Sequence, residues 1–171
     1  MLVLFPAKPE RSSIWAPDAA FAIRRGDAEI GRIDLSGSPK RYGEDSIRLG
    51  ERRFECRIHI TGRKRWTYIP SRWLMYAGDV ALHAAVCESG KTFLTEGPDP
   101  LRLRRRTFGR SFAIERASDP AQLGEIRWLR ARLVPKPEPL RIVLDTSIEF
   151  PESLEVFLLW IAAQHEFRSS G

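Results

Sequence analysis

The chain has 171 residues, of which 43% are hydrophobic and 29% are charged. These are ordinary values for a folded protein, so they exclude a mainly disordered chain, and the length suits one domain. The net charge of +6 permits an anionic partner without requiring one. All but five of the 28 basic residues are arginine, which pairs bidentately with carboxylates and phosphates but is also frequent in proteins from GC-rich genomes.

The first residues are apolar, but Pro6 and Pro9 interrupt them before a signal-peptide core could form. Because nothing elsewhere suggests export, we expect a cytoplasmic protein without a transmembrane segment. Cys56 and Cys87 lie in apolar, strand-like runs and lack the spacing of metal ligands. We therefore expect buried free thiols, no metal and no cofactor.

Two segments of the chain resemble each other. Residues 21–25 and 30–33 read as a hairpin whose second strand contains Gly31, and residues 112–116 and 123–126 read as a hairpin whose second strand contains Gly124. Agreement in order and spacing favours a single domain over 1–171 built from two similar half-domains, at about 14–100 and 101–171. Coincidence is the alternative, since both strings are short.

Further strands follow the first hairpin. Residues 53–60 alternate strictly between charged or polar and apolar side chains, which predicts a strand with one buried and one solvated face. Strands are also predicted at 66–69, 72–76, 80–87, 92–95, 101–105 and 140–144, separated by glycine and proline. The segment 80–87 could instead form a short helix, because Ala81, Ala84 and Ala85 lower its strand propensity.

The last segment of the chain is a helix that is apolar on all sides. Residues 156–163 are eight consecutive apolar residues, which at about 100° each pass more than twice round a helix. This run is too short to span a bilayer, which takes about 20 such residues, so the rest of the protein must surround it. We predict a mainly β protein: a closed antiparallel barrel of about twelve strands around a buried, hydrophobic C-terminal helix.

This organisation resembles the tubby-like superfamily, which includes tubby C-terminal domains, LURP-one-related proteins and phospholipid scramblases. The resemblance is carried by the hairpin at 112–129, the strand at 140–144 and the closing helix at 151–166. It implies a single tubby-like domain over 1–171 with no shared catalytic residues. Eukaryotic tubby domains bind phosphoinositides through basic surface residues, whereas the cysteine-rich and calcium-binding segments of scramblases have no counterpart here.

The densest charged feature is an arginine row formed by Arg102, Arg104 and Arg106. On a strand these side chains share one face while Leu101 and Leu103 pack inward, which sets the guanidinium groups about 7 Å apart. Such a row could bind the phosphates of a lipid or a nucleic acid. The alternative is a solvated barrel face whose arginines pair with glutamates on neighbouring strands.

A second basic feature is the turn that contains Arg63, Lys64, Arg65 and Trp66. Basic residues beside an aromatic ring suit an anionic interface or a base-stacking platform. Turns are usually polar, however, and a solvated turn explains the same residues.

No catalytic signature stands out from the sequence. His83, Asp145 and Glu149 would act in an enzyme only if they converged in an open cleft, and a helix that fills the barrel removes the concave site a small molecule would use. We therefore expect a non-catalytic binding or scaffolding module that contacts a protein partner or an anionic membrane surface. An anionic-lipid or nucleic-acid binder is the second hypothesis, with nucleic acid the less favoured ligand, and an enzyme is the third.

Overall fold

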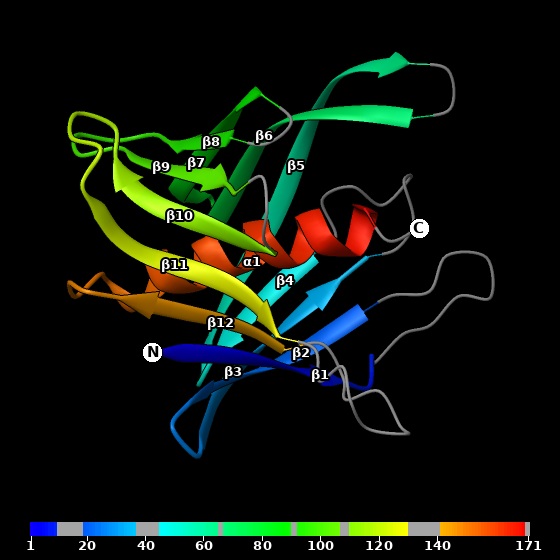
Figure 1. The fold of residues 1–171 in the computed structure, drawn as a ribbon. Helices are drawn as coiled ribbons and strands as arrows, with labels where there is room; N and C mark the ends of the chain where they lie inside the picture. Colours follow the sequence, from blue (N-terminus) through cyan, green and yellow to red (C-terminus); the bar gives the residue numbers. More distant parts are fainter. Residues whose placement is uncertain are drawn as a thin grey trace, which may run out of the picture.

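A computed structural model describes residues 1–9, 19–36, 45–64, 67–89, 92–106, 110–129 and 141–169, without side-chain detail for 61–64, 67–70 and 168–169. The described residues form twelve strands and one helix (Figure 1). The elements are β1 (Leu2–Ala7), β2 (Ala19–Arg25), β3 (Ala28–Leu35), β4 (Asp45–Leu49), β5 (Arg52–Lys64), β6 (Thr67–Ala77), β7 (Val80–Ser89), β8 (Thr92–Thr95), β9 (Leu101–Arg105), β10 (Ser111–Arg116), β11 (Gln122–Leu129), β12 (Arg141–Thr146) and α1 (Glu152–Ser169).

The strands form one closed antiparallel barrel in which neighbours in sequence are neighbours in space. The barrel closes through β1, which pairs with β2 on one side and with β12 on the other, with Leu4 opposite both Ile23 and Ile142. Closure removes the two open edges that a flat sheet would have. The predicted fold class is confirmed.

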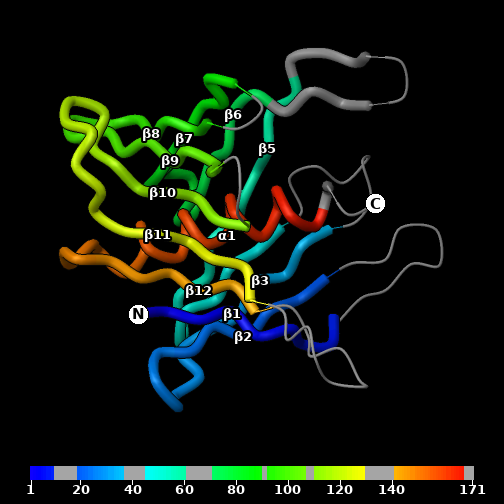
Figure 2. The backbone as a smooth tube through the Cα atoms, in the orientation of Figure 1, coloured from blue at the N-terminus to red at the C-terminus, as the bar shows by residue number. Residues whose placement is uncertain are grey.

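Helix α1 runs through the interior of the barrel (Figures 1 and 2). Every residue from Val156 to Ala163 is at most 1% exposed, so the helix is covered on all sides, as its all-round apolar sequence requires. The inward-facing residues of the strands form the same core cluster as the helix. No helix among the described residues has the length and hydrophobicity needed to cross a membrane.

One buried carboxylate anchors the helix to the barrel wall. Asp45 is 3% exposed and accepts hydrogen bonds from the Trp160 indole through Nε1, at 2.9 Å, and from the side-chain amide of Gln164. Its other oxygen accepts the backbone N–H of Ser36 at 2.7 Å. Buried charge is tolerated only when hydrogen-bonded, so these donors fix both the rotation and the depth of α1 in the barrel.

Ion pairs hold the N-terminal end of the helix. Glu152 lies 2.7 Å from Arg52 and 3.5 Å from Arg25, and Glu155 lies 2.9 Å from Arg25. Acidic side chains in a first turn are stabilised by the helix dipole. The pairs therefore tie the start of α1 to the ends of β2 and β5.

Several details differ from the sequence predictions. Residues 67–69 of the strand predicted at 66–69 and the strand predicted at 72–76 are parts of one strand, β6, while β1 and β4 were not expected. Segment 80–87 is a strand, so the helical alternative is wrong. Neighbouring strands on both sides override the low strand propensity of its alanines.

The two similar hairpins share a local backbone arrangement around a glycine. Gly31 lies opposite Ile23 and Gly124 lies opposite Ile114, and a bulge follows the isoleucine in both. A Cβ atom on Gly31 would collide with the carbonyl oxygen of Arg48, and one on Gly124 would lie 2.6 Å from a carbonyl oxygen of the next strand. Both glycines are therefore required by the close approach of a neighbouring backbone. The division into two half-domains stays a prediction.

Candidate functional site

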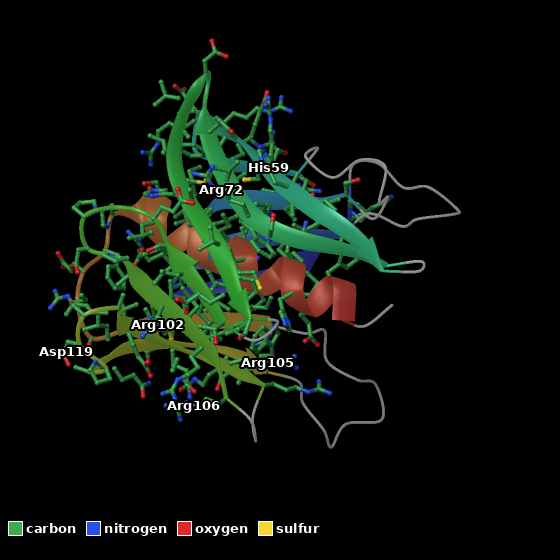
Figure 3. All side chains as sticks on the ribbon, turned by 90° about the horizontal axis from the view of Figure 1, so that it is seen from above. His59, Arg72, Arg102, Arg105, Arg106 and Asp119 are labelled. Carbon is green, nitrogen blue, oxygen red and sulfur yellow. The ribbon has the colours of Figure 1, made fainter. Side chains whose placement is uncertain are left out.

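The predicted arginine row lies on the outer face of β9, with Arg106 directly after the strand (Figure 3). Leu101 and Leu103 are buried, so the alternation is as predicted. Arg102 lies 3.3 Å from Glu88, and Arg106 donates to Gln122 at 2.6 Å and lies 3.8 Å from Glu125. The arginines at both ends of the row thus have acidic neighbours on β7 and β11, each two strands away from β9.

The middle of the row is the most tightly paired. Arg104 donates to Glu115 at 2.6 Å, and the Glu115 side chain is only 7% exposed. A carboxylate shielded from water depends on its partner far more than an exposed one does. Arg104 therefore has a structural role, while binding of anions by the row stays a prediction.

The predicted basic turn is only partly described. Arg63 and Lys64 are the last residues of β5, opposite Tyr68 and Thr67 of β6. Arg65 and Trp66 lie outside the described residues.

The residues considered for catalysis point to different sides of the wall. His83 faces the interior, shares a hydrogen bond of 2.9 Å with Ser153 and packs on Phe157. Burial lowers the pKa of His83, so the neutral ring is favoured. Asp145 lies on the outer face, 3.9 Å from Arg127, in a shallow depression of about 380 Å³ over β11 and β12. Glu149 is exposed in the connection to α1.

Both cysteines are free thiols, and their surroundings disfavour the thiolate. Burial, reinforced by the negative charges of Asp45 and Glu55, raises the pKa of Cys56 well above its usual value. Burial also raises the pKa of Cys87, which is only partly covered and donates to the Ser89 carbonyl at 2.9 Å. Both thiols are therefore poor nucleophiles near neutral pH.

The strand register creates a second basic feature that the sequence analysis missed. Arg32 on β3 lies directly opposite Arg48 on β4, and Arg48 lies directly opposite Arg53 on β5. Each neighbours a buried apolar residue in its strand, so all three face outward. Like charges directly opposite one another across strands repel. The register therefore gathers three guanidinium groups on one part of the outer face.

The line of outward-facing residues that contains Arg32, Arg48 and Arg53 continues onto β2, β1 and β12. Ala22 lies opposite both Arg32 and Phe5. The guanidinium groups of Arg24 and Arg141 lie over the Phe5 ring, 4.9 and 5.0 Å from its centroid, as in cation–π pairs. We call this set the arginine belt; it consists of Arg24, Arg32, Arg48, Arg53 and Arg141, with Phe5 and Ala22 between them.

Within the belt, Arg32 is paired with an acidic side chain and Arg53, in the described part of the chain, is not. Nε of Arg32 donates to both carboxylate oxygens of Asp34, at 2.8 and 2.9 Å, and its terminal nitrogen donates to the Lys8 carbonyl at 2.6 Å. Arg53 is exposed and has no ion-pair partner among the described residues. The sequence analysis could not find the belt because its arginines come from five strands between positions 24 and 141. Only the pairing register of the strands brings these arginines together.

Within the part of the chain that the structure describes, no three histidine, cysteine, aspartate or glutamate side chains gather into a group that could hold a metal ion. A scan of protein-family models, a search of the curated proteins and a search of the solved structures each found no match to this chain.

Proposed function

We propose that the protein is a non-catalytic binding or scaffolding module of the tubby-like, LURP-one-related type, whose outer barrel surface contacts a protein partner. The observation that carries the proposal is the filled interior: the space where a barrel of this size could hold a ligand contains Phe157, Leu158, Trp160 and Ile161, all fully buried. A closed barrel threaded by an apolar C-terminal helix also supports the tubby-like resemblance. A partner must then be recognised by the outer surface of the barrel.

The outer face of β6 to β8 supports a protein partner. Leu74 lies opposite Ala84, and Val86 lies opposite Leu94. Their inward-facing neighbours show that all four are on the outer face, where Leu74 is only 3% exposed and the other three are partly exposed. With Tyr76 they form an apolar stripe on a face that is otherwise polar. Beside it, the hairpin between β6 and β7 leaves Val80 and Leu82 64% and 43% exposed.

Ion pairs border the apolar stripe. Arg72 forms a bidentate pair with Glu96, Arg102 pairs with Glu88, and Arg57 stacks on the Tyr76 ring at 4.9 Å. Figure 3 shows Arg72 and Arg102 at separate places on this outer surface. An apolar centre with a charged rim is the usual anatomy of a protein–protein interface.

The proposal can be tested with a photo-cross-linking side chain placed at position 86 or 94 in cells that express the protein. We expect the same protein adduct from both positions and none from position 119, an exposed control in the connection between β10 and β11. Adding Val86→Glu to the chain labelled at 94 should abolish the adduct, because a buried unpaired carboxylate is costly in an interface. Equal labelling from all three positions, or no adduct from 86 and 94, would refute a partner on this face.

A further inference from the structure

We propose that the arginine belt binds the phosphate backbone of a single-stranded nucleic acid. The belt uses β12 and β1 to β5, the half of the barrel that does not carry the apolar stripe, so this inference does not depend on the protein partner proposed above. Its basis is the cross-strand register, which sets Arg32, Arg48 and Arg53 side by side on the outer face of three adjacent strands.

The side chains of the belt are oriented for phosphate. A guanidinium group offers a planar fork of donors that matches phosphate oxygens bidentately. Phe5 supports the flat faces of Arg24 and Arg141, and Asp34 fixes Arg32 through Nε. Nε of Arg24 is buried and has no hydrogen-bond partner among the described residues. Such fixed guanidinium groups lose little freedom when a phosphate arrives.

The shape of the belt selects among polyanions. Its arginines extend across six adjacent strands, which at about 4.8 Å per strand is roughly 24 Å of path around half of the twelve-stranded wall. A flat bilayer touches a convex barrel only along a narrow zone, and duplex DNA, with a persistence length of about 150 base pairs, cannot follow the curve either. A single strand is flexible enough to contact all five arginines.

Fluorescence anisotropy with a labelled single strand of roughly 20 thymidines tests the proposal across a salt series. If all five arginines contact phosphates, the slope of log K against log salt should be about −3.5, or roughly a 100-fold loss of affinity between 50 and 200 mM salt. The triple variant Arg32→Gln, Arg48→Gln, Arg53→Gln should bind at least about 10-fold more weakly at low salt and show a slope of about −1.4.

The matched control removes the same charge from the other arginine row, with Arg102→Gln, Arg104→Gln and Arg106→Gln. We expect its slope to remain near that of the parent, since the belt is intact and β9 lies on the other half of the barrel. An equal or larger loss in the control would overturn the belt as the site. So would tighter binding to polyglutamate, to a matched duplex or to phosphatidylserine vesicles than to the single strand.

A second measurement uses the unaltered protein, so it does not depend on how the variants fold. Arginine modification by phenylglyoxal, mapped by mass spectrometry, should slow at Arg48 and Arg53 when the single strand is bound and stay unchanged at Arg102 and Arg106. Unchanged modification at Arg48 and Arg53 under saturating single strand would contradict the proposal.

Discussion

The hairpin of β2 and β3 and the hairpin of β10 and β11 are built alike, but their outer surfaces differ. In both, a glycine lies opposite an isoleucine, a bulge follows, and the next strand passes close to the glycine. Beside Gly31 the outward pair is Arg32 opposite Arg48, whereas beside Gly124 it is Glu125 opposite Asp145. The glycine and the bulge thus set the shape of the barrel wall, whereas the charge of its outer surface can differ between the two hairpins.

The inner surfaces of the two units differ as well. When Gly31 is aligned with Gly124, Asp45 at the start of β4 corresponds to Ile142 near the start of β12. Both are buried, but Asp45 accepts hydrogen bonds from α1 while Ile142 only packs. One unit therefore holds the helix in position, and the other only covers it.

The largest effect should come from removing that difference with Asp45→Ala. The change leaves three buried donors, from Ser36, Trp160 and Gln164, without their acceptor, and each such loss costs about 1–3 kcal/mol. We expect the free energy of unfolding to fall by at least about 3 kcal/mol, measured by urea denaturation. Trp160→Phe removes one of the donors, so it should lower the free energy of unfolding by less in the Asp45→Ala variant than in the parent protein. If the effects of the two substitutions on the free energy of unfolding simply add, Asp45 does not anchor the helix through Trp160.

A smaller effect should follow from filling the two glycine positions. A Cβ atom meets the Arg48 carbonyl at Gly31 and the Asp145 carbonyl, at 2.6 Å, at Gly124. Gly31→Ala and Gly124→Ala should each lower the free energy of unfolding by about 1–3 kcal/mol, as overpacking does, and Gly31→Ala by more. Gly26→Ala is an informative comparison, because its Cβ would meet nothing within 4 Å although its φ of 60° disfavours alanine. If Gly31→Ala lowers the free energy of unfolding by less than Gly26→Ala does, the close approach of the neighbouring backbone is not what requires glycine at position 31.

The smallest effect concerns the outer charges. Arg53→Glu should raise the free energy of unfolding by about 0.2–1 kcal/mol, because it places an opposite charge across from Arg48. Arg104→Glu should lower it, because it removes the partner of the shielded Glu115. Thermal melts of the two variants at low ionic strength will show whether their stabilities change in opposite directions. A loss of stability in both variants would mean that Arg53 of the belt is as structural as Arg104 of the row on β9.

Much of the fold was accessible from the sequence because its patterns are local. The alternation over 53–60 and the apolar run over 156–163 each identify one element and its buried face. Strand β4 was missed because its five residues follow a polar stretch that resembles a loop, and β1 was missed because Pro6, with Pro9 shortly after the strand, resembles a break. Proline is accepted in β1 at Pro6, which is exposed near the end of the strand, beyond the residues paired with β12.

The site was much less accessible because it depends on contacts between distant residues. The row on β9 was found because its arginines are consecutive in one strand, but its glutamate partners come from β7, β10 and β11. The belt and the Asp45 anchor depend on which strands become neighbours and in which register. A shift of one residue would turn Arg48 inward and Ile47 outward, so no single segment carries that information.

The position of α1 after all twelve strands in the sequence affects how the protein acquires its structure. The inner faces of the strands have nothing to pack against until residues 156–163 have left the ribosome, and the bond between Asp45 and Trp160 spans 115 residues. Long-range closures of this kind are entropically costly and slow. We expect the strands, which are synthesised first, to stay unpacked until the helix has been synthesised, so that the barrel folds in one step around the helix.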